Sequence, residues 1–157
     1  MKKLVLIVSA FVAGVMHSTA QDPNEVLGGL INEADYFELG RQYPVLSNKA
    51  GLHPMLKSLA EAVLYNASND PEKTCESIGN LLNNHQDELG FVNSMGMLVM
   101  LANNMVKMGR FDEAENILAG VVNNPAVREH APEQLMAVLD QTYDKTSIYK
   151  GHPATQM

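Results

Sequence analysis

The chain has 157 residues and a formal net charge of −7 at pH 7 with histidine neutral. Its excess of carboxylates excludes the broad basic patch that nucleic-acid and anionic-membrane binders require. An apolar content of 46 % argues for a packed core rather than a disordered chain, and the length fits one domain. With 1 cysteine, the chain can form neither an internal disulfide nor a multi-cysteine zinc site.

Residues 1–20 have the pattern of a secretory signal peptide. Lys2 and Lys3 precede an apolar run that extends from Leu4 to Met16, and small residues lead up to Ala20. The run is shorter than the roughly 20 residues that a permanent membrane helix needs. We therefore expect cleavage between Ala20 and Gln21 and a periplasmic or secreted protein, without a membrane span in the mature chain. Loss of the two lysines makes the mature charge about −9.

Helical periodicity dominates the mature chain, and its clearest example is a predicted helix-turn-helix between residues 101 and 122. Leu101 and Met105 share a helix face that ends near Gly109, a residue suited to a left-handed cap. Asp112 opens a second helix, in which Ala114, Leu118 and Val121 fall on one face, and Pro125 follows. The small residue, the aromatic Phe111 after the turn and the closing proline resemble a tetratricopeptide (TPR) repeat.

The same register recurs upstream. A shift back by 40 residues places a turn at Asn69, and a further 34 places one at Asp35, with Phe37 matching Phe111. In the first unit, Pro44 is expected to break the second helix, and a polar joint is expected at residues 85–90. The sequence thus predicts an all-α, TPR-like α-α hairpin repeat array over residues 21–150, with about three hairpins, a C-terminal helix and a tail at 151–157. The first helix of each unit is expected at residues 24–34, 51–67, 91–108 and 132–147. An ordinary helical bundle is the alternative.

The order of segments in the mature chain also resembles the helical N-terminal region of secreted bacterial retropepsin-like aspartyl proteases. This order includes the Tyr43-Pro44 break, the Leu81-Leu82-Asn83-Asn84 segment and Ser147 to Pro153. The catalytic tripeptides of that family, Asp-Thr-Gly and Asp-Ser-Gly, do not occur in this sequence, so no catalytic residue carries over. The resemblance implies a non-catalytic helical module that stands alone or forms the regulatory region of a protease whose catalytic domain lies elsewhere.

The residues that could carry chemistry have simpler structural interpretations. His85 and Glu88 share one helical turn, but the spacing of a three- or four-ligand metal site is missing. His85 is expected in a solvated loop, His53 near a helix start, and Cys75 as a half-buried structural thiol. We expect no cofactor, no metal and no enzymatic activity. The methionine-rich stretch at 95–108 is expected to lie mainly in the core, with a partner groove or a soft-metal site as alternatives.

A protein or peptide partner is the expected ligand, because the first helices of stacked hairpins tend to line the concave surface. Non-core positions of these helices carry amides, which are poor helix formers and are easier to explain if they hydrogen-bond a neighbouring helix or a bound backbone. Binding of loop backbone or water is the alternative. The candidate partner-binding residues are Asn66, Asn93, Asn103, Asn104 and Lys107.

Overall fold

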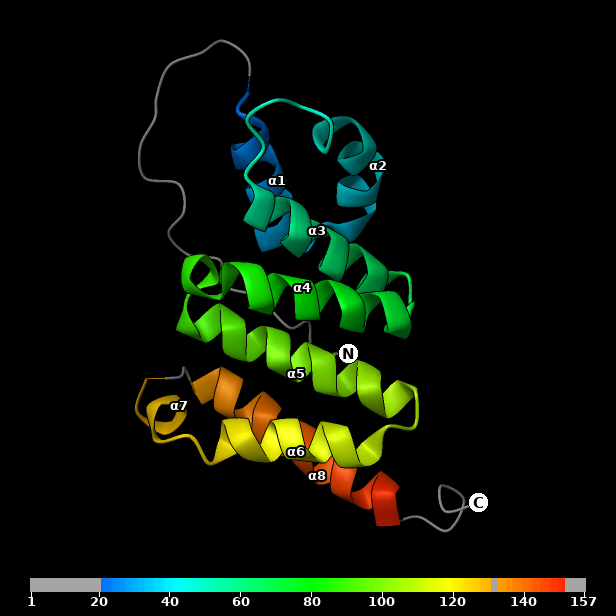
Figure 1. Cartoon of the computed structure of the whole chain (residues 1–157), viewed down its shortest axis with the longest axis vertical. Coiled ribbons are helices and arrows are strands. Elements are labelled where there is room, and N and C mark those ends of the chain that lie inside the picture. The colour runs from blue at the N-terminus through cyan, green and yellow to red at the C-terminus, as the bar shows by residue number, and fades with distance from the viewer. Residues whose placement is uncertain (1–20, 131–132, 152–157) are drawn as a thin grey trace.

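A computed structural model describes residues 21–130 and 133–151, and within these ranges the chain forms eight helices and no strand (Figure 1). The helices are α1 (Pro23–Asn32), α2 (Tyr36–Leu46), α3 (Pro54–Ala67), α4 (Pro71–Leu89), α5 (Phe91–Lys107), α6 (Phe111–Val122), α7 (Pro125–His130) and α8 (Glu133–Gly151). The predicted all-α class is confirmed. The predicted signal peptide at 1–20, Pro132 and most of the predicted tail lie outside the described residues.

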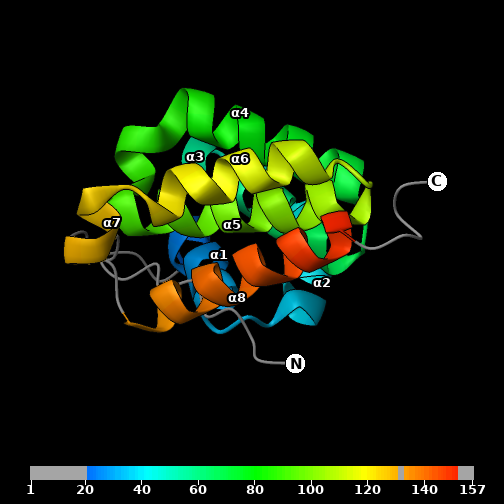
Figure 2. The ribbon, with the colours of Figure 1, turned by 90° about the horizontal axis from the view of Figure 1, so that it is seen from below.

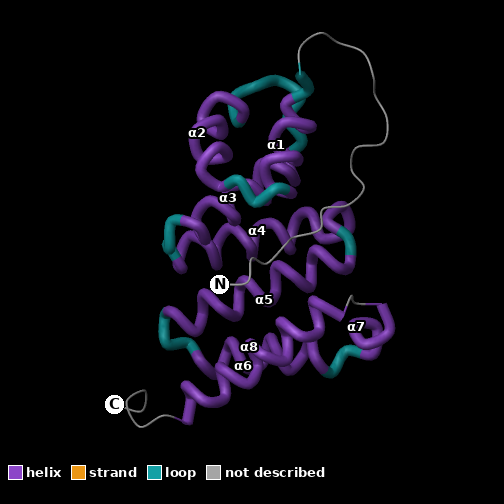
Figure 3. Tube along the Cα trace, turned by 180° about the vertical axis from the view of Figure 1, so that it is seen from behind, coloured by secondary structure: helices purple, strands orange, loops and turns teal. Residues whose placement is uncertain are grey.

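The helices form a stack of hairpins. The pairs α1/α2, α3/α4 and α5/α6 are each joined by a three-residue turn, so the two helices of a pair run antiparallel (Figure 3). Each pair packs on the next, and α8 packs mainly against α6 and also touches α5. The last predicted helix therefore covers the end of the stack, as a solenoid requires.

The three hairpin turns share one backbone geometry. Ala34, Asn69 and Gly109 each adopt a left-handed conformation, with φ of 54°, 57° and 74°. In each turn the next residue donates its N–H to a carbonyl five residues back, as in the bonds from Asp70 to Tyr65 and from Arg110 to Met105. This is the Schellman ending of a helix, and its threefold recurrence gives the stack an internal repeat.

The first unit is out of register by one residue in the sequence-based alignment. The turn there is centred on Ala34 rather than Asp35, so Tyr36 and Leu39 match Phe111 and Ala114. The error came from pairing the two phenylalanines: Phe37 is 83 % exposed, whereas Leu39 is fully buried.

Two other expectations about element boundaries were wrong. Pro44 does not break the second helix: α2 runs through it and ends two residues later, although the proline cannot donate the usual N–H bond to the Gly40 carbonyl. The polar joint at 85–90 is helical for most of its length: α4 continues to Leu89, with a kink at His85 (φ −136°, ψ 18°), and Gly90 leads directly into α5. The short helix α7 was not predicted.

The core has two parts that share α5. Met97 and Met100 pack with buried residues of α1 to α4, whereas Val99 and Ala102 pack with those of α6 to α8. Because α5 is apolar around most of its circumference, it lies in the interior of the stack. Most of the methionine-rich stretch is buried, as expected, but Met108 is only partly buried.

Candidate functional site

The five predicted partner-binding residues do not form one surface. Asn104 is fully buried, and its Nδ2 donates to Asn66 Oδ1 on α3 at 2.9 Å and to the Met100 carbonyl at 2.8 Å. Two of the four amides, Asn66 and Asn104, therefore join α3 to α5. Asn93 donates to the Leu89 carbonyl at 3.0 Å and secures the α4–α5 junction.

Asn103 and Lys107 are exposed, four residues apart on α5. They remain available to a ligand, but the other three amides, which hydrogen-bond within the protein, do not accompany them. The Asn104 Oδ1 atom has no hydrogen-bond partner among the described residues, and its full burial separates it from any surface ligand.

A different feature has the form of a binding site: an open groove of about 830 Å³ along α4 and α5. Its α4 wall consists of Glu72, Cys75, Glu76 and Gly79, which lie on one helix face at successive spacings of three, one and three residues. Gly79 leaves this wall flat, since a Cβ placed there would meet nothing within 4 Å.

The groove floor is apolar. Leu101 and Met105 of α5 and its cap residue Met108 contribute this floor, and the Cys75 Sγ lies 4.0 Å from the Leu101 carbonyl oxygen. Thioether side chains are flexible and polarisable, so a floor of this kind can adapt to different apolar partners. Arg110, the residue that precedes α6, also lines the groove.

The groove rim is negatively charged. In the part of the chain that the structure describes, neither Glu72 nor Glu76 makes an ion pair. Arg110 does not neutralise them, because its guanidinium is engaged by Glu113, with Nε 2.7 Å from Oε1. Lys73 pairs with Asp70 at 3.5 Å and lies over the Tyr65 ring.

Burial raises the pKa of the Cys75 thiol above its ordinary value, and the positive charge of Arg110 opposes this only in part. The thiol is therefore protonated at neutral pH and is a poor nucleophile. The prediction of a half-buried structural cysteine agrees with this position at the groove wall.

In the next hairpin, α5/α6, the acidic residues equivalent in position to the groove wall of α4 are paired with a lysine. By the 40-residue register, Asp112 and Glu115 on α6 correspond to Glu72 and Cys75 on α4. Both accept hydrogen bonds from Lys150 Nζ of α8, at 2.8 and 2.5 Å. These bonds raise the pKa of Lys150. On α6 a lysine from a packed helix thus satisfies the carboxylates, whereas on α4 the carboxylates are left without a cation from the described residues.

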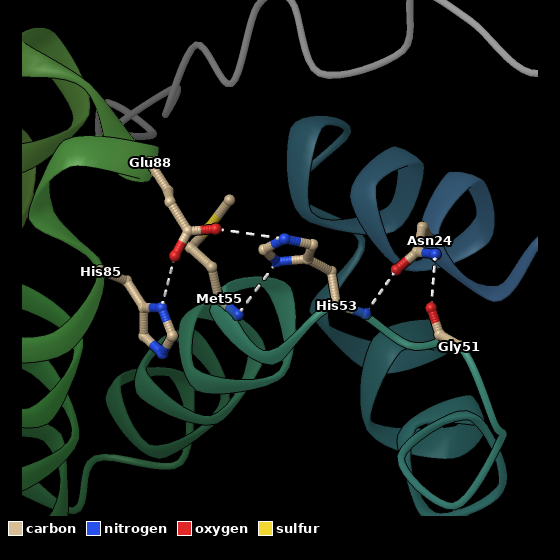
Figure 4. A network of polar contacts seen from close by, with 6 residues as sticks. All are labelled: Asn24, Gly51, His53, Met55, His85 and Glu88. Carbon is tan, nitrogen blue, oxygen red and sulfur yellow. Dashed lines mark hydrogen bonds and ion pairs between the residues drawn. The ribbon is translucent and has the colours of Figure 1, made fainter.

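A second polar cluster lies at the other end of α4, where Glu88 bridges two histidines (Figure 4). Glu88 Oε2 lies 3.1 Å from His53 Nε2, and Oε1 lies 2.8 Å from His85 Nδ1. His53 Nδ1 also accepts the Met55 N–H at 3.3 Å and so caps α3, while the His53 N–H donates to Asn24 Oδ1 at 2.7 Å. His85 is thus in a kinked helix and not in the expected loop, and the cluster fastens α1, α3 and α4 together.

This cluster is a hydrogen-bonded fastening rather than a metal centre. Each imidazole directs a nitrogen at the same carboxylate, and the second nitrogen of His53 is used in the cap. Among the described residues, no group of three histidine, cysteine, aspartate or glutamate side chains has the arrangement to hold a metal ion. The spacing of His85 and Glu88 was visible in the sequence, but the approach of His53 from 35 residues upstream was not.

Comparison of the chain with family models, curated proteins and solved structures gives no match. Within residues 21–130 and 133–151, no helix combines the length and the apolar character needed to cross a membrane.

Proposed function

We propose that the protein is an exported, non-catalytic helical-repeat module that binds a protein or peptide partner in the groove along α4 and α5. Export is proposed from the signal-like residues 1–20. The resemblance of the hairpins to TPR repeats supports the interaction role, since such arrays present extended surfaces to partners. The observation that carries the proposal is the groove itself, which has an adaptable apolar floor beside carboxylates that lack a cation in the described structure.

Gly79 offers a direct test because a side chain there projects into the groove without disturbing the fold. The residue is helical and the space around a new Cβ is empty, so Gly79→Leu should fold as well as wild type or slightly better. Gly120→Leu on α6 is the matched control, since Gly120 is also helical, with empty space around a new Cβ, and does not line the groove.

The experiment selects peptides from a displayed library on the purified wild-type protein and then measures their affinity for both variants by fluorescence anisotropy. The proposal predicts peptides that bind wild type and Gly120→Leu alike and lose at least tenfold in affinity for Gly79→Leu. Peptides that bind all three proteins equally would show that the groove is not the binding site.

A further inference from the structure

The charge and shape of the groove indicate which class of partner it accepts. We infer that the partner segment is a basic amphipathic helix, with apolar side chains on the floor of Leu101, Met105 and Met108 and lysine or arginine beside Glu72 and Glu76. The inference rests on the proposed function and specifies its ligand.

The shape argument concerns the direction of the groove walls. Residues 72–79 of α4, and residues 101–107 of α5 with its cap residue Met108, each contribute about two helical turns to the lining, or roughly 10 Å of length along each helix. A straight wall beside a straight floor forms an open trough, the geometry in which an amphipathic helix presents apolar anchors at every third or fourth position. The flat surface at Gly79 allows the backbone of such a helix to approach α4.

The charge argument concerns what surrounds Glu72 and Glu76. Arg110 is held by Glu113, and Lys73 by Asp70, so neither nearby cation is directed to the two glutamates. The fold already pairs a lysine from a packed helix with the equivalent acidic position of α6, through Lys150. A partner that brings lysine or arginine to the rim of α4 would make the same kind of contact, and the acidic mature chain favours its approach.

The test uses three synthetic peptides of about 16 residues, long enough for partial helicity in water, with leucine on one face and lysine, glutamine or glutamate on the other. Their affinities are measured by anisotropy at low and high salt against wild type and the double variant Glu72→Gln with Glu76→Gln. The matched control is Asp140→Asn with Asp144→Asn, which removes the same charge from exposed positions four residues apart on α8.

The lysine peptide should bind wild type most tightly, and the groove variant should weaken it about two- to thirtyfold, as expected for two solvent-exposed ion pairs. The control pair should change the affinity less than twofold, and added salt should reduce the difference between the groove variant and wild type. If the groove double variant and the control double variant weakened binding equally, the peptide would be attracted only by the overall acidic charge of the protein, and the inference would be overturned.

The fate of the inference can be separated from that of the proposed function. If the glutamine or glutamate peptide binds as tightly as the lysine peptide and Gly79→Leu still blocks it, the groove is a binding site but not one for a basic helix. If Gly79→Leu leaves the binding of every peptide unchanged, the proposed function fails as well.

Discussion

The residue at the left-handed position of each hairpin turn should control stability through the backbone alone. Ala34 and Gly109 occupy equivalent positions with φ of 54° and 74°. A left-handed conformation is strained for alanine and free of strain for glycine. We therefore predict that Ala34→Gly stabilises the protein and that Gly109→Ala destabilises it.

The magnitude follows from two opposing terms. Releasing an L-residue from the left-handed region gains about 1–2 kcal/mol, while the extra unfolded-state freedom of glycine costs roughly 0.5–1 kcal/mol. Loss of the half-buried Ala34 methyl costs a few tenths of a kcal/mol more. Ala34→Gly should therefore raise the free energy of unfolding by about 0.5 kcal/mol, or Tm by about 2 °C. Gly109→Ala should lose about 0.5–1 kcal/mol, because its new Cβ meets only Phe111 Cε2 at 4.0 Å, an ordinary contact.

Urea unfolding followed by circular dichroism measures both effects. Ala137→Gly is the matched control, because it makes the same substitution at an exposed, right-handed position inside α8 and should cost about 0.5–1 kcal/mol. The identical chemical change should thus have opposite signs at residues 34 and 137. A loss of stability at both positions would refute the equivalence of the three turns.

Three further predictions concern other contacts. His53→Ala should lower the free energy of unfolding in urea by about 1 kcal/mol because it removes the side-chain cap of α3, and His53→Asn should recover most of that loss. If the two variants lost equal stability, the cap would contribute nothing. Hydrogen bonds, chiefly from Arg41, lower the pKa of Glu38 to about 2. The pair therefore stabilises the fold fully above the ordinary glutamate pKa, and this stabilisation is lost as the pH falls to about 2. Carboxyl NMR titration should show this pKa and its return toward the ordinary value in Arg41→Gln, and an unchanged titration would contradict the pairing. Asn104→Leu should leave the free energy of unfolding unchanged or raise it by about 1 kcal/mol, because it removes a buried side-chain carbonyl that has no hydrogen-bond partner among the described residues. A loss above about 2 kcal/mol would show that the hydrogen bond to Asn66 contributes more than the unpaired carbonyl costs.

The sequence was most informative where local signals agreed. Near Gly109, a glycine at the turn, acids in the first turn of the next helix and one apolar face all predict the same hairpin, and α5 and α6 follow it closely. In the first unit the turn residue is Ala34, which carries no glycine signal, and exposed Phe37 offered a false match. The one-residue error arose there because hydrophobicity alone does not distinguish a core aromatic from an exposed one.

The candidate site was less predictable than the fold. The acidic face of α4 reads in sequence as an ordinary solvated face, and only its position beside the apolar face of α5 turns it into a groove. The amides were recognised as unusual helix residues, but their partners depend on helix packing: Asn104 pairs with Asn66 across 38 residues. The contact of His53 with Glu88 likewise depends on a kink at His85 that no local pattern predicts.

Protection of Cys75 tests the binding role of the groove most directly. Cys75 lines the groove wall and is the sole cysteine of the sequence, so the rate at which a maleimide alkylates it at mildly alkaline pH, where more of the thiol ionises, reports occupancy of that place. A saturating basic amphipathic peptide should slow the reaction several-fold, and a peptide of the same composition with its apolar residues scrambled should not. An unchanged alkylation rate with the amphipathic peptide demonstrably bound would place the partner elsewhere and contradict the proposed site.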